Sequence, residues 1–369
     1  MSQPEQVKLL GQSLQELTSL AEDLGEPAFR GRQIFEAIYR QRSASADEIS
    51  TLPLGLRSTL LANGYSVGLP RIEKKFSSTD GTVRYLIGFD DGRSVETVWM
   101  PEGDGGEAGD GSDAGEDAGR GWDRATICVS SQAGCAVDCQ FCFTALLGVE
   151  RNLTAGEIVG EICAVLKDQR ISPPQDRINV VFMGMGEPLL NYDNFIKAVH
   201  LLVEGVGIPE SRMTVSTAGI VPRIYEFGLE PVRPKLAISL NASNDELRSR
   251  LMPLNRKWNL TKLMAAAREF PLRNREKLTF EYVLLDGVND SARNAQEVAE
   301  LIRGLRAKAN LIAFNPGPGV DFRTPKEERV LEFQRILVSA GVPAFIRRPR
   351  GREIYAACGQ LKRTTAITG

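Results

Sequence analysis

Histidine is nearly absent from this chain, because His200 is the only one among 369 residues. It lies in FIKAVHLLVEGV, whose apolar residues recur at helical spacing, so we expect a partly buried side chain and not a ligand. Catalysis by a histidine triad and metal sites built on histidine are therefore essentially excluded. The chain also lacks an apolar run as long as a membrane span, and no secretory signal opens it. We expect a cytoplasmic protein, not bound to a membrane, whose cysteines stay reduced.

An excess of charge of one sign is also lacking, since the formal net charge is −2. Hydrophobic residues make up 42% of the chain, enough for a full core and more than one domain. The stretch 102–119, EGDGGEAGDGSDAGEDAG, has seven acidic residues and no basic one, so we expect a disordered loop there. Outside it, 45 basic residues stand against 40 acidic ones. The rest of the chain is therefore mildly basic, which permits an RNA partner.

The first part of the chain, residues 1–70, predicts a small helical domain. SLQELTSLAEDLG and GRQIFEAIYRQ have a 3.6-residue apolar period, and SADEISTLPLGLRSTLLANG predicts two shorter helices broken at Pro53 and Gly55. Four arginines of this domain fit a solvated face and a surface that contacts RNA phosphates equally well. They are Arg30, Arg32, Arg40 and Arg42. RNA binding by this domain is therefore a hypothesis.

The next segment, residues 71–123, predicts a strand-rich connector. Its first thirty residues alternate between apolar and polar side chains, as antiparallel strands do. Asp80-Gly81 and Asp91-Gly92 are typical of the tight turns that join such strands.

Strand-like and helix-like segments alternate from residue 124 to residue 342. The strand-like segments are RATICVSS, INVVFMG, RMTVSTA, KLAISLN, KLTFEYVLLDG and NLIAFNP. We expect the first helix to begin at Thr154, with Glu157 completing a capping box. Six such units predict an α/β fold, a partial (β/α)6 barrel of the TIM type with its chemistry at the carboxyl ends of the strands. Residues 343–369 form a C-terminal extension.

Three cysteines in the run GCAVDCQFC have a spacing typical of a metal centre: Cys135, Cys139 and Cys142. A cubane of four irons needs four ligands, so three thiolates leave one iron open to a substrate. Cys128 lies seven residues upstream, and a closed zinc site of four cysteines is the alternative. Zinc ribbons pair two C-x2-C units, and only one is present here, which favours the cluster. Cys163 lies in a helical segment, where we expect it in the core.

Polar residues gather where the predicted strands end. Gly186 and Glu187 belong to GMGEP after the second strand; the glycines let backbone approach a ligand, and the carboxylate suits an ammonium group. Four further residues end later strands, and each alone is typical of a turn or a cap. They are Ser216, Ser239, Asn241 and Asn315. Together they would line one mouth with groups that bind a ribose and a carboxylate.

The C-terminal segment IRRPRGREIYAACGQLKR places Cys358 among six basic residues and one acid. A buried cysteine beside a solvated basic face is one interpretation. Cations also lower the pKa of a thiol, and guanidinium groups hold phosphates well. A reactive cysteine in an enzyme that acts on RNA is the other interpretation.

Several motifs together resemble one family. TICVSSQAGCAVDCQFC, with Phe141 before the last cluster cysteine, resembles the signature of radical S-adenosylmethionine (SAM) enzymes. RNLTAGEIVGEI, FMGMGEPLLN, VSTAGIVP, LAISLNASND, LLDGVNDS and RGREIYAACGQL extend the resemblance to the radical SAM RNA adenine methyltransferases. The chain is most similar to the dual-specificity branch (RlmN-type), which methylates carbon 2 of adenine in 23S ribosomal RNA and in tRNA.

The resemblance implies a mechanism with two cysteines and two SAM molecules per turnover. One SAM methylates Cys358, and a second, bound to the open iron of a 4Fe–4S cluster, yields a radical that abstracts hydrogen from that methyl group. The carbon then adds to adenine, which gives a covalent protein–RNA adduct. Glu96 is implied as the proton acceptor, and Cys128 attacks the sulfur of Cys358, which leaves a disulfide and free methyladenine.

The resemblance also implies ligands and partners. Cys135, Cys139 and Cys142 would hold the cluster. SAM would contact Gly186, Glu187, Ser216, Ser239, Leu240, Asn241 and Asn315. An electron donor such as flavodoxin and a thiol reductant would serve the cycle, and we expect a monomer.

Three features depart from the family, and two rival functions remain. Asn241 stands where histidine is usual, Phe143 is bulkier than the usual small residue, and the insertion 102–119 is unexpected. One rival is methylation of carbon 8 of adenine in 23S ribosomal RNA (Cfr-type), which shares both cysteines and the cluster. The other is a non-catalytic RNA-binding protein with structural zinc.

Overall fold

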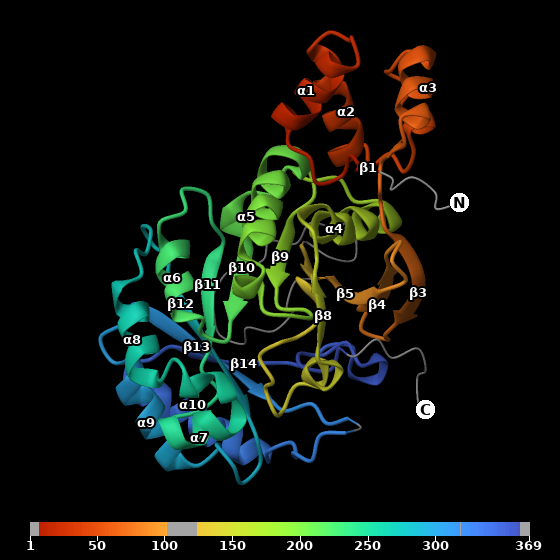
Figure 1. Ribbon diagram of the computed structural model, residues 1–369. Coiled ribbons are helices and arrows are strands. Elements are labelled where there is room, and N and C mark those ends of the chain that lie inside the picture. The colour runs from red at the N-terminus through yellow and green to blue at the C-terminus, as the bar shows by residue number, and fades with distance from the viewer. Residues whose placement is uncertain (1–6, 102–123, 318, 362–369) are drawn as a thin grey trace.

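The computed structural model describes residues 7–101, 124–317 and 319–361 (Figure 1). The predicted disordered loop at 102–119 lies outside the described residues, as does the end of the C-terminal extension beyond 361. Within the described ranges, no helix is both long and apolar enough to cross a membrane.

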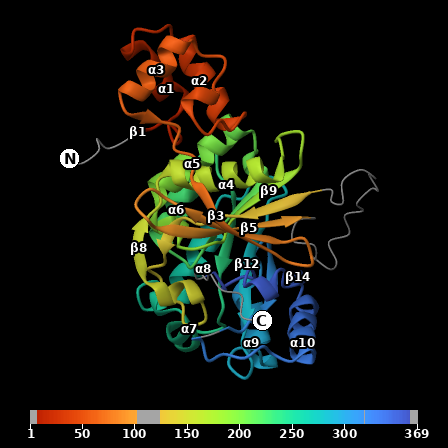
Figure 2. The same ribbon diagram turned by 90° about the vertical axis from the view of Figure 1, so that its right-hand side faces the viewer.

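The N-terminal domain is a small helical lobe that lies at one end of the molecule (Figures 1 and 2). It consists of β1 (Val7–Lys8), α1 (Leu14–Asp23), α2 (Phe29–Tyr39), η1 (Ala46–Glu48), α3 (Leu54–Ala62) and β2 (Tyr65–Ser66). β1 and β2 pair in parallel and close the lobe. The helices expected here are confirmed, but the predicted break at Gly55 is wrong, because α3 begins after Pro53 and runs through that glycine.

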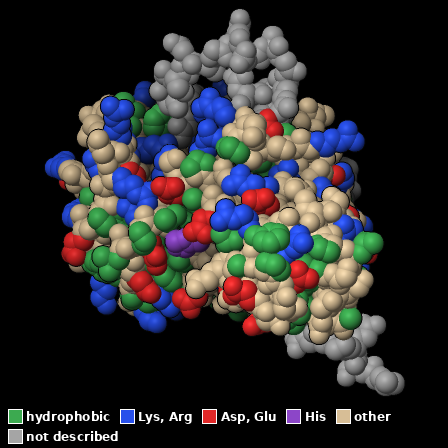
Figure 3. Space-filling view, turned by 90° about the horizontal axis from the view of Figure 1, so that it is seen from above, with side chains coloured by type: hydrophobic (Ala, Val, Ile, Leu, Met, Phe, Trp, Pro, Cys, Tyr) green, Lys and Arg blue, Asp and Glu red, His purple; other side chains and the backbone are tan. Residues whose placement is uncertain are grey.

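Two of the arginines in this lobe join it to the rest of the protein. Arg40 donates from Nη2 to the Glu204 carbonyl over 3.4 Å, and the buried Arg42 donates to Ser172 Oγ over 3.2 Å. Arg30 lies over the ring of Phe29. Figure 3 shows basic, acidic and hydrophobic side chains mixed on the face seen from above, without one basic patch. A structural role therefore accounts for Arg40 and Arg42.

A single mixed sheet of ten strands forms the body of the protein. Its order is β14-β13-β12-β11-β10-β9-β6-β5-β4-β3, in which β6 and β9 to β14 run parallel and β3 to β5 are antiparallel. The strands are β3 (Arg71–Ser77), β4 (Val83–Gly88), β5 (Ser94–Pro101), β6 (Ala125–Cys128), β9 (Ile178–Phe182), β10 (Met213–Thr217), β11 (Lys235–Ser239), β12 (Leu278–Leu284), β13 (Ala307–Ala313) and β14 (Ala344–Arg347). The six predicted parallel strands are confirmed. β14, which the predicted boundary placed in the C-terminal extension, is a seventh.

Helices cover the outer face of this curved sheet (Figure 1). They are α4 (Ala155–Gln169), α5 (Tyr192–Leu201), α6 (Val221–Gly228), α7 (Asp245–Leu251), α8 (Leu260–Glu269), α9 (Ala292–Ile302) and α10 (Glu327–Ser339). The capping box at the start of α4 is confirmed, since Thr154 Oγ1 accepts from Glu157 N and Glu157 Oε2 accepts from Thr154 N. Cys163 on α4 is fully buried in the core, as expected.

Short elements complete the chain and shape the loops around the barrel. They are β7 (Gln132–Gly134), η2 (Phe143–Leu147), β8 (Val149–Asn152), η3 (Pro188–Leu190), the π-helical turn η4 (Leu202–Val206), η5 (Glu210–Arg212), η6 (Pro253–Arg256) and η7 (Arg352–Ile354). β7 and β8 pair as an antiparallel hairpin on either side of the three-cysteine loop.

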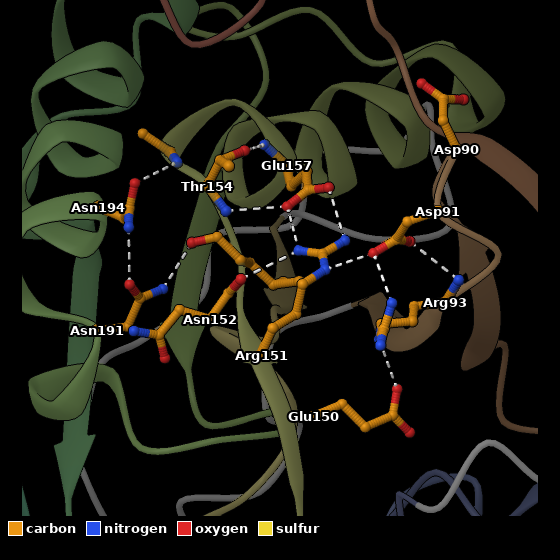
Figure 4. Close-up of polar contacts among 12 residues, drawn as sticks. Asp90, Asp91, Arg93, Glu150, Arg151, Asn152, Thr154, Glu157, Asn191 and Asn194 are labelled. Carbon is orange, nitrogen blue, oxygen red and sulfur yellow. Dashed lines mark hydrogen bonds and ion pairs between the residues drawn. The ribbon is translucent and has the colours of Figure 1, made fainter. Parts of the chain in front are cut away.

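A network of charged side chains fixes this hairpin (Figure 4). Arg151 on β8 donates two hydrogen bonds to Glu157 on α4, over 2.7 and 2.9 Å, and a third to Asp91 over 2.6 Å. Arg93 also binds Asp91, and its Nε lies 3.1 Å from Glu150 on β8. The hydrogen bond from Arg151 lowers the pKa of Asp91 to about 2. The β4–β5 turn, β8 and α4 therefore hold one another in place.

Candidate active site

A cavity of about 280 Å³ runs along the inner face of the curved sheet. Its lining brings together Cys128 at the end of β6, Cys142 of the three-cysteine loop and Cys358 of the C-terminal segment. That segment, dark blue in Figure 1, lies beside the yellow loop that contains η2. Three of the cysteines singled out in the sequence therefore meet in one place.

The three-cysteine loop leaves the β7–β8 hairpin at Gly134. Cys135 N donates to the Gly148 carbonyl over 2.8 Å, and Cys142 N donates to the Cys139 carbonyl over 3.1 Å. Gly134 has φ +84°, and a Cβ there would come within 1.8 Å of the Gly148 carbonyl oxygen, so only glycine fits. Burial raises the pKa of the Cys135 thiol to about 12, and it also raises the pKa of the Cys139 thiol. These thiols must lose their protons when they bind a metal.

The three thiols of the loop fit a cluster ligand set, and Cys128 lies with Cys358 in the lining of the cavity. A tetrahedral zinc site needs its sulfurs within roughly 4 Å of one another, since each lies about 2.3 Å from the metal. In the described residues, no three His, Cys, Asp or Glu side chains are grouped closely enough to hold a single ion. The charge of Cys358 affects the pKa of Cys128, and the charges of Cys135 and Cys142 affect the pKa of Cys139. Three thiols with an open position match the donor set of a larger iron–sulfur cluster.

The Gly-rich turn after β9 packs directly against the chain that leads to this loop. A Cβ on Gly184 would lie 2.7 Å from the Val129 carbonyl oxygen, and one on Gly186, whose φ is +96°, would lie 2.6 Å from Gln132 Cβ. Glu187 is 4% exposed and accepts hydrogen bonds from Leu189 N and Ala218 N. Burial raises its pKa to about 7. A bound ammonium group would favour the charged form of this carboxyl.

The strand-end residues expected to contact SAM fall into two groups. Ser216 and Ser239 lie side by side with their Oγ atoms 3.1 Å apart, and Asn315 lines the cavity. Asn315 Oδ1 is buried without a hydrogen-bond partner among the described residues, so a ligand can use it. The side chain of Asn241 instead bonds within the fold, because its Oδ1 accepts from Val283 N and its Nδ2 contacts the sulfur of Met252. The backbone of Leu240 is likewise bonded within the fold, since its N–H donates to the Glu281 carbonyl and its carbonyl accepts from Arg248 Nε.

Arg248 holds the mouth of the barrel together, although nothing in the sequence distinguishes it from the neighbouring Arg250. Its side chain is fully buried, and burial lowers its pKa to about 10. The guanidinium donates to the carbonyls of Leu240, Ser239 and Ala218, and also to Asn255 Oδ1. It therefore joins the end of β11 to the residue that follows β10.

Replacement of Arg248 by leucine is expected to lower the free energy of unfolding by about 3 kcal/mol, because three buried carbonyls lose their donor. Urea unfolding followed by circular dichroism measures the change. Arg250→Leu is the matched control on the same helix, since Arg250 is exposed, and its effect is expected to stay within about 0.5 kcal/mol. Equal losses for the two variants would contradict the role assigned to Arg248.

The C-terminal segment is fastened at two places, with Cys358 between them. At the cluster loop, Phe143 N donates to the Gly359 carbonyl over 2.9 Å and Thr144 Oγ1 donates to the Leu361 carbonyl over 2.7 Å. At the β3–β4 turn, Glu353 accepts hydrogen bonds from Ser78 and Thr79. Sequence reasoning missed these contacts, which join parts of the chain far apart. Phe143, the unusual bulky residue after Cys142, is buried beside Gly317, where a Cβ would meet its ring.

Cys128 and Cys358 both have pKa values raised above that of an ordinary thiol. The surrounding protein, although the residue itself is exposed, and the Glu281 carboxylate raise the pKa of Cys358, while Arg347 acts in the opposite direction. Arg347 of the basic tail therefore acts on this pKa in the expected direction, but the net shift is upward. Burial, together with the nearby Cys358, also raises the pKa of Cys128.

Glu96, expected as a proton acceptor, lies on β5 in a buried ion pair with Arg84. The guanidinium of Arg84 in turn lies over the ring of Phe76, 4.2 Å from its centre. Glu96 is not among the described residues that line the cavity. The structure thus places its carboxylate outside the cavity that contains Cys128 and Cys358.

A partial barrel of parallel strands, a three-thiol loop after its first strand and a Gly-rich turn after its second together define a radical SAM enzyme. In agreement, residues 129–301 match the model of the radical SAM superfamily. Its cofactors are a 4Fe–4S cluster and SAM.

Similarity over the whole chain defines the family more narrowly. The chain is 66% identical over 347 residues to the probable dual-specificity RNA methyltransferase RlmN of Koribacter versatilis, which covers 94% of this chain and 99% of that protein. It is 44% identical over 353 residues to the RlmN of Syntrophobacter fumaroxidans, covering 95% and 96%. A crystal structure of a radical SAM methyltransferase from Sphaerobacter thermophilus matches with a TM-score of 0.86 and 41% identity, covering 96% and 99%. This protein belongs to the RlmN family of dual-specificity RNA methyltransferases.

Proposed function

We propose that the protein methylates carbon 2 of adenine in 23S ribosomal RNA and in tRNA, in the cytoplasm. The observation that carries this proposal is the meeting of Cys128, Cys142 and Cys358 in one cavity. The printed names of the relatives, dual-specificity RNA methyltransferases, supply the class of substrate.

The chemistry of adenine supports a radical route. Carbon 2 lies between two ring nitrogens and is electron-poor, so it cannot attack the methyl group of SAM as a nucleophile. A cluster bound at the three loop cysteines would supply the electron that cleaves SAM, and the resulting radical could abstract hydrogen from a methyl group on Cys358. Glu187 and Asn315 are the residues we assign to SAM, because one is a buried carboxyl near the loop and the other has an unused acceptor.

Cys128 and Cys358 have separate tasks in this proposal. Cys358 first accepts a methyl group from one SAM and then holds the carbon that is added to the base. The anchors at Phe143 and Thr144 keep its sulfur in the cavity. Cys128 attacks that sulfur, which releases methylated RNA and leaves a disulfide between the two cysteines. Both thiols have a raised pKa, so each nucleophilic step needs a base to take the proton.

Glu96 is the proposed acceptor of the proton that leaves the adenine ring. Its present partner is Arg84, and Val98, two residues along β5, lies directly opposite Cys128 on β6. For Glu96 to act, its carboxylate must exchange Arg84 for the bound base.

Basic side chains at the cavity support RNA as the substrate. Lys235 lies at the start of β11, while Arg348 and Arg350 follow β14, and all three line the cavity. Guanidinium and ammonium groups bind the phosphates next to a base that enters such a cavity. The proposed cycle also uses an electron donor such as flavodoxin and a thiol reductant that reopens the disulfide, and the enzyme acts as a monomer.

The test is a nucleoside analysis by mass spectrometry after the anaerobically purified enzyme has acted on 23S ribosomal RNA and on tRNA with SAM and reductant. We expect 2-methyladenosine from both RNAs and none without reductant. Formation of 8-methyladenosine instead would show the rival carbon-8 activity. A colourless, zinc-containing preparation that leaves both RNAs unmodified would favour the non-catalytic alternative.

A further inference from the structure

Two polar side chains stand in the wall of the cavity without a role in the chemistry described above. Glu281 is at the middle of β12 and Asn310 is at the middle of β13, paired in register across the two strands. Asn310 Nδ2 donates to Glu281 Oε1 over 2.9 Å. Both residues line the cavity with Cys128 and Cys358, and they are 8% and 4% exposed.

The amide of Asn310 has a hydrogen-bond acceptor to spare. Its Oδ1 is buried and has no hydrogen-bond partner among the described residues. A flipped amide would turn this oxygen toward the Glu281 carboxylate, acceptor against acceptor, so the present orientation is the favourable one. An unsatisfied buried oxygen costs free energy, and such groups in native proteins call for an explanation such as a ligand.

The pair lies close to the reacting sulfur. Among the charged groups that affect Cys358, Glu281 has the largest effect on its pKa. A base held in reach of Cys358 is therefore also near Glu281 and Asn310. The unpaired Asn310 oxygen matches a ligand group that donates a hydrogen bond, and the bond to Glu281 holds the amide in that orientation.

We propose that Asn310, held in orientation by Glu281, selects adenine as the target base by accepting a hydrogen bond from its exocyclic amino group. This proposal rests on the function proposed above and adds the residues that give it base specificity. Adenine presents an amino donor where guanine presents a carbonyl acceptor, so the Asn310 oxygen repels guanine. Neither residue takes part in bond making; they are positioning residues for the base.

The experiment compares two RNA substrates, one with adenine and one with unsubstituted purine at the target position. Purine keeps carbon 2 and the ring nitrogens but lacks the amino group. For the wild-type enzyme, we expect kcat/KM of methylation to fall roughly 10- to 100-fold with purine, the usual effect of a lost hydrogen bond to a charged or buried group. For Asn310→Leu, we expect nearly equal, low values for both RNAs, so the adenine-to-purine ratio approaches one.

Three controls separate this proposal from its alternatives. Methylation of Cys358 by SAM needs no RNA, so its rate in Asn310→Leu is measured separately from base selection. Glu281→Gln keeps the side-chain volume, so it tests the pair if the leucine variant does not fold, and its ratio is also expected to fall. Gln334→Leu removes an amide that bonds to the Ala344 carbonyl from α10, outside the cavity, and should keep the wild-type ratio.

Several outcomes would overturn the assignment. One is a wild-type enzyme that methylates both RNAs equally well, and another is a variant that keeps the wild-type ratio. Slower methylation of Cys358 in Asn310→Leu would mean that the pair binds SAM and not the target base. If the wild-type enzyme produced no methyladenosine even from adenine-containing RNA, the proposed function itself would have failed.

Discussion

An enzyme with Cys358 replaced by alanine is expected to cleave SAM slowly and to transfer no methyl group to RNA. The methyl carrier is lost, while the loop cysteines and the backbone bonds that hold the tail remain, because Phe143 N and Thr144 Oγ1 bind main-chain carbonyls. The two activities can be measured in one reaction, as 5'-deoxyadenosine by chromatography and as methyladenosine by mass spectrometry.

Cys163→Ala is the matched control for this loss. Cys163 is fully buried in α4 and is not among the described residues that line the cavity, so its replacement should leave methyl transfer within a small factor of the wild-type value. Methyladenosine formed by Cys358→Ala at a rate like that of the control would show that the tail cysteine is not the carrier.

Replacement of Cys128 by alanine should have a different effect, the accumulation of RNA joined covalently to the protein. In the proposed cycle, nothing else attacks the sulfur of Cys358, so the reaction stops after at most one turnover. The adduct would survive denaturing electrophoresis as a slow band and would yield, after digestion, a peptide containing Cys358 with an added nucleotide.

This prediction has its own control and its own point of failure. The double variant Cys128→Ala, Cys358→Ala should form no adduct, because the carbon has no sulfur to link it to the protein. Sustained turnover by Cys128→Ala would require another way to release the product, and the proposed pairing of the two cysteines would be abandoned.

The elements of the fold that were predicted correctly are mostly those that local sequence specifies. The parallel strands are short apolar runs, and the capping box at Thr154 and Glu157 depends on residues three apart. The seventh parallel strand, β14, was not predicted, because its four residues AFIR run directly into the basic tail. Its partner is β13, and pairing of that kind depends on the assembled sheet, not on the strand itself.

The same distinction holds for the site: features set by residues adjacent in sequence could be predicted, and features set by distant residues could not. The three-cysteine loop could be predicted because its ligands lie within eight residues of one another. The state of the Cys358 thiol could not, since the Glu281 carboxylate that raises its pKa comes from β12, far away in the sequence. Arg248 and Asn310 gave no local signal for the same reason, because their partners come from other strands.

The bond between Thr144 and Leu361 joins residues 217 positions apart, and Cys358 lies just before its far end. A growing chain can therefore form the cluster loop and most of the sheet before the methyl carrier has been synthesised. Translation has to pass residue 361 before the active site can be complete, and a prematurely ended chain would retain the iron-binding loop without the means to modify RNA. The enzyme that would modify ribosomal RNA is thus assembled only from chains that have been translated at least as far as residue 361.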